Sequence, residues 1–138
     1  MSDLFVDTSG WANLIDVSQL FHSLSVKIYQ NARSQKHKII TTSYIITELI
    51  ALLSKPLSIP RPKAIAFIQS LKTSPYIEVI HISKEIDTKA WELLMQRQDK
   101  EWSLVDCSSF IVMQESKITE SLTSDHHFEQ AGFICLLK

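Results

Sequence analysis

Short segments that suit β-strands alternate along this chain with longer segments that suit helices. The strand candidates are apolar, rich in β-branched residues, or alternate apolar with polar residues, and they cover residues 3–6, 37–42, 76–82, 117–124 and 133–137. Helices are expected at 19–35, 43–54, 63–72, 83–97 and 103–116, with short helical turns at 11–16 and after residue 125. Strands separated by helices form βαβ units. The sequence therefore predicts an α/β fold of three layers, α/β/α, around a central, mostly parallel sheet.

Length and composition limit the class of protein. A chain of 138 residues fits one domain, which we expect to span 1–138. Its 45% hydrophobic and 21% charged residues are typical of globular proteins, and two glycines are too few for a glycine-rich phosphate-binding loop. No apolar run approaches the roughly 18 residues that span a bilayer. The start, MSDLFVD, lacks the basic and apolar regions of a signal peptide. We expect a cytoplasmic protein with no membrane partner.

The chain has two cysteines, Cys107 and Cys135. They lack the CxxC spacing of zinc and redox motifs, and two thiols alone do not complete a structural zinc site. Both lie in apolar surroundings, LVDCSSFIV and GFICLL. We therefore expect both to be unreactive residues of the core.

Four acidic residues fall near the predicted carboxyl edge of the sheet, where folds of this type bind their ligands. Asp7 and Asp125 directly follow the first and fourth predicted strands, Asp106 lies in the first turn of the helix that Ser103 begins, and Glu48 lies about six residues after the second strand. Asp7 and Asp125 could instead cap the helical turns that follow them. Asp106 could complete a capping box with Ser103, although that motif prefers Glu or Gln.

Glu48 is harder to explain as a structural residue. The spacing i, i+3, i+4 and i+7 places four residues on one helical face: Ile45, Glu48, Leu49 and Leu52. An unpaired carboxylate among apolar side chains is strongly disfavoured, and no Lys or Arg stands three or four residues away on this helix. Helical side chains lean toward the helix N-terminus, here toward Asp7. We therefore expect Glu48 to be buried, or at the mouth of a cleft, on the side of the sheet edge.

Carboxylates that converge on one edge repel each other unless a cation neutralises them. A set of oxygen ligands without His or Cys favours Mg²⁺ or Mn²⁺. A carboxylate-bound Mg²⁺ keeps several waters, one of which can attack a phosphodiester. The sequence therefore predicts a metal-dependent phosphodiester-cleaving site. Its ligands, called the four pocket acids below, are Asp7, Glu48, Asp106 and Asp125.

Four segments resemble, in order and spacing, the motifs of PIN-domain ribonucleases. They are LFVDTSGW, SYIITELIALL, EWSLVDCSSFIVM and LTSDHHFEQAGF, and the resemblance extends over essentially the whole chain. The likeness is strongest to VapC-type toxins of bacterial toxin–antitoxin systems. It implies a parallel PIN-like sheet, endonuclease activity on RNA that depends on Mg²⁺ or Mn²⁺, a homodimer, and inhibition by a small cognate antitoxin.

The same resemblance implies roles for individual residues. The four pocket acids match, in order, the family's metal-binding acids. Ser9 and Thr123 match hydroxyls that hydrogen-bond these acids or hold the water of the metal. Asp99, in RQDKEWS, is a further candidate neighbour of the pocket, and a loop acid exposed to solvent is its alternative.

Other functions agree with parts of the sequence. The pair His126 and His127 suggests a histidine metal site, but adjacent residues of a short helix are expected to point in different directions. An Asp after the first strand is also the nucleophile of aspartyl-phosphate enzymes. In the dehalogenase-like class a second Asp follows two residues later, where this chain has Ser9. A non-catalytic RNA-binding or protein-interaction module with the same fold stays open.

The remaining surface suggests where partners bind. Without the four pocket acids, 11 of the 15 acidic residues remain against 14 Lys and Arg, so the rest of the chain is mildly basic. The candidate contacts to an RNA backbone are Arg33, Lys36, Lys38, Lys55, Arg61 and Lys63. Segments 19–29 and 54–68 carry more apolar residues than one small core needs. They are the candidate contacts for the dimer and the antitoxin.

Overall fold

The structure, a computed structural model, describes residues 3–138, so the first two residues of the predicted domain lie outside it. Within that range five strands form one sheet, and each neighbouring pair is parallel. The strands are β1 (Leu4–Val6), β2 (Ile39–Thr42), β3 (Ile77–Ile80), β4 (Glu120–Leu122) and β5 (Ile134–Cys135), in the order β3-β2-β1-β4-β5. The predicted parallel α/β architecture is confirmed.

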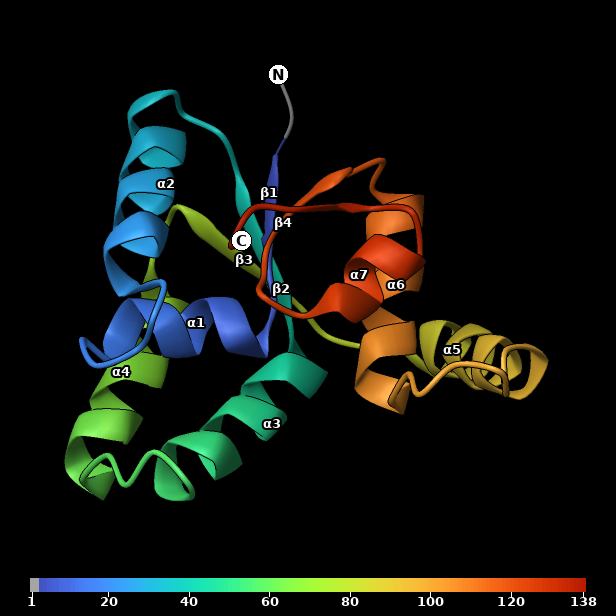
Figure 1. The fold of residues 1–138 in the computed structure, drawn as a ribbon, viewed down its shortest axis with the longest axis horizontal. Helices are drawn as coiled ribbons and strands as arrows, with labels where there is room; N and C mark the ends of the chain where they lie inside the picture. Colours follow the sequence, from blue (N-terminus) through green and yellow to red (C-terminus); the bar gives the residue numbers. More distant parts are fainter. Residues whose placement is uncertain (1–2) are drawn as a thin grey trace.

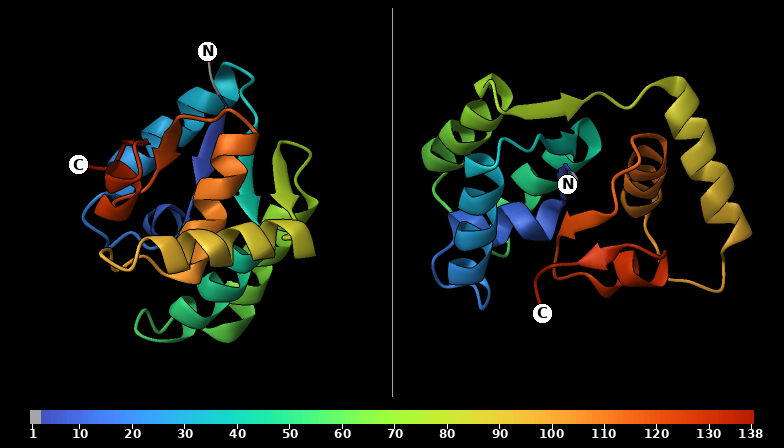
Figure 2. Two further views of the ribbon diagram at one scale, coloured as in Figure 1. Left: turned by 90° about the vertical axis from the view of Figure 1, so that its right-hand side faces the viewer. Right: turned by 90° about the horizontal axis from the view of Figure 1, so that it is seen from above.

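Seven helices cover the sheet in the described part of the chain. They are α1 (Thr8–Ile15), α2 (His22–Ser34), α3 (Ser43–Ser54), α4 (Arg61–Thr73), α5 (Lys84–Gln96), α6 (Leu104–Glu115) and α7 (His126–Gln130). With the sheet seen nearly edge-on, α1, α2 and α4 lie on one side of it and α5, α6 and α7 on the other (Figure 1). The view from above shows the same two helical layers (Figure 2). The three-layer prediction therefore holds.

The centre of the sheet is buried on both faces. All three residues of β1 and all four of β2 are buried, which is why these strands read as continuous apolar or β-branched runs rather than alternating ones. In register, Phe5 lies beside Ile40 of β2 and Ser121 of β4. The aromatic side chains of Phe110 and Phe128 continue this core, with ring centroids 5.0 Å apart.

The strand order places a switch point between β1 and β4. From β1 the chain moves outward through β2 to β3, and it then returns to the other side of β1 to form β4 and β5. Crossovers that leave in opposite directions open a crevice at the carboxyl ends of the two central strands. Asp7 follows β1 directly, and Asp125 lies three residues beyond β4.

Element boundaries differ from the sequence prediction mainly where side chains form caps. α1 begins at Thr8, three residues before the expected turn, because the Asp7 carboxylate accepts a hydrogen bond from the Gly10 N–H. α3 spans the predicted residues 43–54, with Thr42 as its cap. Both cysteines are buried and unpaired, as expected. Among the described helices, none has the length and apolar character needed to cross a bilayer.

Candidate active site

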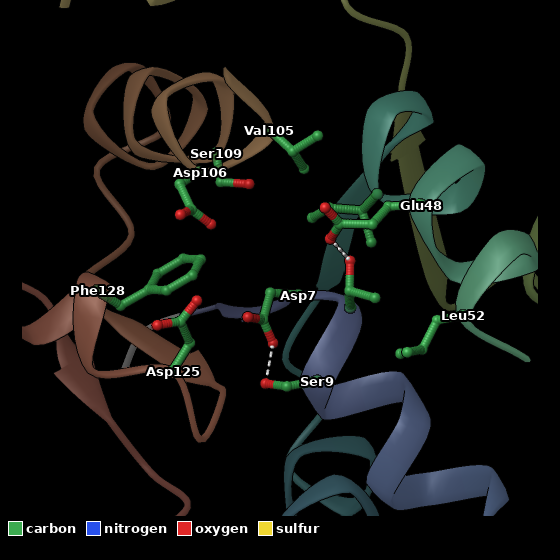
Figure 3. A pocket seen from close by; sticks show the side chains of 11 residues that line it. Asp7, Ser9, Glu48, Leu52, Val105, Asp106, Ser109, Asp125 and Phe128 are labelled. Atoms are coloured by element: carbon green, nitrogen blue, oxygen red, sulfur yellow. Dashed lines mark hydrogen bonds between the residues drawn. The ribbon is translucent and has the colours of Figure 1, made fainter. Parts of the chain in front are cut away.

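A pocket of about 230 Å³ opens at the carboxyl ends of β1 and β4, between α3 and α6 (Figure 3). Four separate segments bring acidic side chains to its wall: the end of β1, the middle of α3, the first turn of α6, and the residue before α7. The lining includes Asp7, Glu48, Asp106 and Asp125. The sequence-predicted acids therefore meet in one cavity.

Asp7 is the most buried of these acids. It is 6% exposed, and its carboxylate accepts hydrogen bonds from Ser9 Oγ at 2.8 Å, the Gly10 N–H at 2.9 Å and Thr123 Oγ1 at 2.7 Å. Burial raises the pKa of Asp7 from 3.8 to about 7, since the three hydrogen bonds offset only part of the lost hydration and the charge of Asp125 adds to the rise. Asp7 is thus both the helix cap and a pocket acid. The two interpretations were not exclusive.

Gly10 allows Asp7 to sit this close to the fourth strand. A Cβ atom at this position would lie 2.1 Å from the Leu122 carbonyl oxygen and 2.8 Å from Val6 Cγ1. Only a residue without a side chain lets the first turn of α1 pack against the end of β4. That contact brings the N-terminus of α1 beside Thr123, the residue directly after β4. The Thr123 hydroxyl donates a hydrogen bond to the Asp7 carboxylate.

Glu48 lies at the mouth of the pocket rather than in the core. Ile45 and Leu49, its neighbours on the helical face, are both 0% exposed, whereas Glu48 remains in contact with solvent. Its carboxylate turns toward the sheet edge and accepts a hydrogen bond from Thr8 Oγ1 (Figure 3). Of the two expected placements, burial or the mouth of a cleft, the structure has the second.

Asp106 and Asp125 close the opposite wall. Asp106 accepts a hydrogen bond from the Ser103 N–H at 3.0 Å and its own N–H donates to Ser103 Oγ, so the capping box is present with Asp in place of Glu. Burial raises the pKa of Asp106, and the charge of Asp125 raises it further. Asp125 caps the short helix α7 through the His127 N–H at 2.9 Å.

His127 joins these two acids, a role that the sequence analysis missed. Its Nδ1 lies 3.0 Å from Asp106 Oδ2 and 3.3 Å from Asp125 Oδ1. Carboxylates only accept hydrogen bonds, so an N–H at Nδ1 fits between them. The spacing of Asp125 and His127 across a helix start was the available signal. The link to Asp106, 21 residues away in the chain, depends on the fold.

The two histidines do not diverge as expected. The ring centroids of His126 and His127 lie 4.5 Å apart. One ligand atom from each ring and one carboxylate oxygen of Asp125 fall within 4.8 Å of one another. Of this trio, Asp125 lines the pocket, and His126 is exposed to solvent.

The supporting residues fall in two groups. Ser9 and Thr123 lie beside Asp7, with their hydroxyls 3.1 Å apart, and Thr123 Oγ1 also accepts the Asp125 N–H at 2.9 Å. Asp99 does not line the pocket. It lies in the turn between α5 and α6, exposed to solvent, and pairs with Arg97 through two hydrogen bonds of 3.0 and 3.2 Å. The structure thus places Asp99 according to its alternative, as a surface loop acid.

The donor set suits a hard divalent cation. Carboxylate oxygens from four segments face one cavity, and two of these carboxyls have raised pKa values because burial leaves their charge uncompensated. Mg²⁺ and Mn²⁺ prefer oxygen ligands, and such an ion would supply the missing positive charge. The residues present therefore fit a divalent metal.

The chain resembles known proteins in sequence and in fold. A model of the PIN domain family matches residues 4–134. The 23S rRNA-specific endonuclease VapC20 of Mycobacterium tuberculosis is 28% identical over 131 residues, which cover 95% of each chain. The crystal structure of VapC20, described as a sarcin-ricin loop cleaving toxin, superposes with a TM-score of 0.83 at 27% identity over 96% of this chain and 97% of that one. FitAcB from Neisseria gonorrhoeae shares the fold, with a TM-score of 0.64 and 12% identity over 96% and 94% of the two chains.

Proposed function

Because the chain belongs to the PIN domain family, we propose that it is an endoribonuclease dependent on Mg²⁺ or Mn²⁺ and the toxin of a toxin–antitoxin pair. One observation carries the proposal: carboxylates from four separate segments line a single pocket at the switch point of the sheet. The likeness to VapC20, whose name describes a 23S rRNA-specific endonuclease, supports RNA as the substrate class and makes ribosomal RNA the first one to test.

The four pocket acids would hold the metal, Asp7, Asp106 and Asp125 on the inner wall and Glu48 at the mouth. A divalent ion bound there supplies an activated water and stabilises negative charge on phosphoryl oxygens. The chain itself fixes the acids in advance. Hydrogen bonds from Ser9 and Thr123 restrain Asp7, and one from Thr8 restrains Glu48. The His127 ring lies between Asp106 and Asp125 and restrains both. Carboxylates restrained in this way keep their arrangement against mutual repulsion.

The candidate RNA contacts separate into two ends of the molecule. Arg33, Lys36 and Lys38 precede β2, so they lie at the amino ends of the strands, opposite the pocket. Arg33 and Lys38 are also engaged, over the Tyr76 ring at 3.6 Å and with Glu78 at 3.9 Å. Lys55 follows α3, the helix that carries Glu48. We therefore assign backbone contacts near the cleaved bond to the Lys55 end rather than to the Lys36 end.

Partner binding is proposed from exposed apolar side chains in the two predicted segments. Leu20 is 87% exposed, Leu24 36% and Ile65 53%. Burying such side chains against another chain is favourable, and we propose these positions as contacts for a second copy and for a small cognate antitoxin in the cytoplasm. Light scattering of Leu20→Ser beside the parent protein tests the homodimer. An unchanged mass for a dimeric parent would remove Leu20 from the interface.

The test of the proposed function is RNA cleavage with matched acid variants. Purified protein is incubated with fluorescent single-stranded RNA and with ribosomal RNA, in Mg²⁺, Mn²⁺ or EDTA. We expect cleavage that requires the metal, is lost in Glu48→Gln and persists in Asp99→Asn, an acid outside the pocket. Equal cleavage by the parent and Glu48→Gln would indicate a contaminant. RNA binding without cleavage of either substrate would favour the non-catalytic module.

A further inference from the structure

Ser109 presents an unpaired hydroxyl inside the pocket. The residue is 1% exposed, and its Oγ has no hydrogen-bond partner among the described residues. It lies on α6 one turn after Asp106 and lines the same cavity as the four pocket acids. Figure 3 shows its oxygen directed from α6 into the pocket. A buried hydroxyl without a partner costs free energy, so this orientation needs an explanation.

The adjacent serine shows what α6 ordinarily does with a hydroxyl. Ser108 is fully buried and donates to the Val105 carbonyl oxygen at 2.7 Å, a local bond that is common for serine in helices. Ser109 could be satisfied in the same manner by turning toward the preceding turn of its helix. Instead its Oγ faces the cavity.

Two other hydroxyls that line the pocket are already committed to protein acceptors. Thr8 Oγ1 donates to Glu48, and Ser9 Oγ donates to Asp7. Among the described residues that line the cavity, Ser109 is the side-chain hydroxyl whose hydrogen has no acceptor. Among the described side chains that line the pocket, Ser109 is therefore a free hydroxyl donor beside several acceptor oxygens.

We propose that Ser109 Oγ donates a hydrogen bond to a non-bridging phosphoryl oxygen of the RNA at the bond that is cleaved. The proposal rests on the proposed nuclease function. A phosphoryl oxygen is an acceptor, and the carboxylates around it offer no hydrogen. A metal-bound water, by contrast, is itself a donor. Its hydrogens can bond to the carboxylate oxygens, so it has less need of the Ser109 hydroxyl. Ser109 is thereby a substrate-binding residue of the site, distinct from the metal ligands.

The test compares Ser109→Ala with two matched serine variants. Ser121 is also fully buried and lacks a partner in the described chain, but it lies in β4 and does not line the pocket. Ser121→Ala therefore controls for deleting an unpaired buried hydroxyl, and Ser108→Ala for deleting a paired one on the same helix. All three are made in the Glu48→Gln background, so that bound RNA is not cut.

Binding of a short fluorescein-labelled single-stranded RNA is measured by anisotropy in Mg²⁺. We expect Ser109→Ala to weaken RNA binding roughly tenfold, the effect of losing one hydrogen bond to a charged acceptor. Ser108→Ala and Ser121→Ala are expected to bind like their parent. In urea, the unfolding midpoint of Ser109→Ala should equal or exceed that of its parent, because the lost hydroxyl was unpaired. A purely structural role would instead lower that midpoint.

Two results would overturn the proposal while leaving the nuclease function intact. The first is RNA affinity of Ser109→Ala equal to that of Ser121→Ala. The second is a loss of Mn²⁺ affinity in Ser109→Ala, measured by calorimetry without RNA, as large as its loss of RNA affinity. That would place the hydroxyl on the metal's water. Failure of the parent to bind any RNA would contradict the proposed function, and the phosphate contact with it.

Discussion

Replacing Asp7 by Asn removes a buried charge that the metal-free protein holds at a cost. The Asp7 carboxyl has a pKa of about 7 in the folded protein because it is buried, against 3.8 in an exposed reference state. Asn has nearly the same shape and can still accept hydrogen bonds from Ser9 and Gly10 through its oxygen. The amide nitrogen replaces Oδ2, which accepts from Thr123, so the variant removes the charge together with that one hydrogen bond, and the pH dependence separates the two effects.

The sign of the pH dependence follows from the raised pKa. Between about pH 4 and about pH 7 the folded protein keeps a proton on Asp7 that the unfolded chain releases, so stability falls as pH rises through this window. Each pKa unit corresponds to about 1.4 kcal/mol. Between about pH 5 and about pH 8, the parent should lose about 3 kcal/mol that Asp7→Asn does not lose. Groups far from Asp7 titrate alike in both proteins and cancel in the difference, whereas Asp125, whose charge raises the pKa of Asp7, remains coupled to it.

Urea unfolding of both proteins in EDTA, followed at several pH values, measures this difference. We expect the stability of Asp7→Asn relative to the parent to rise from pH 5 to about pH 7 and then to level off toward pH 8. Added Mg²⁺ at pH 8 should then stabilise the parent more than the variant, because a bound ion stabilises the folded state by mass action. A difference independent of pH would show that Asp7 titrates normally and would refute the argument from burial.

Further consequences concern His127, Gly10 and Cys107. His127→Ala removes the side chain that restrains Asp106 and Asp125, so it should lower Mn²⁺ affinity roughly tenfold or more in calorimetry. An unchanged affinity would limit His127 to packing. Gly10→Ala should lower the free energy of unfolding by about 3 kcal/mol, because its Cβ would meet the Leu122 carbonyl at 2.1 Å. A stable variant would contradict the close contact of α1 with β4. Burial raises the pKa of the Cys107 thiol to about 11, so a thiol-specific reagent should label it only on unfolding, and fast labelling of the native protein would count against this.

The fold was predictable because strand and helix signals agreed along most of the chain. Ser83 and Ser103 were expected to begin helices, and both cap α5 and α6 through side-chain hydrogen bonds. β-branched and apolar runs gave the strands, although β5 has only two residues because little of the run 133–137 finds a neighbour to pair with. Such local rules depend on residues close in sequence, and they need no knowledge of tertiary contacts.

The candidate site was only partly predictable. The positions of the four pocket acids at strand ends and on one helical face indicated where they would gather, which follows from topology. Ser9 and Thr123 were expected beside the acids, but two other partners were not predicted. Thr8 reaches Glu48 across 40 residues, and His127 reaches Asp106 across 21. Ser109 was not among the predicted site residues. Side-chain hydrogen bonds between distant segments depend on packing, which sequence periodicity does not encode.

Mn²⁺ titration by calorimetry tests the central claim most directly, because it needs no assumption about which RNA is cut. The titration compares the parent protein, one variant for each pocket acid and the surface control Asp99→Asn. We predict that the parent and Asp99→Asn bind Mn²⁺ alike and that the four variants bind it more weakly. The variants are Asp7→Asn, Glu48→Gln, Asp106→Asn and Asp125→Asn. Equal binding by all six proteins would contradict a metal site built from the four pocket acids.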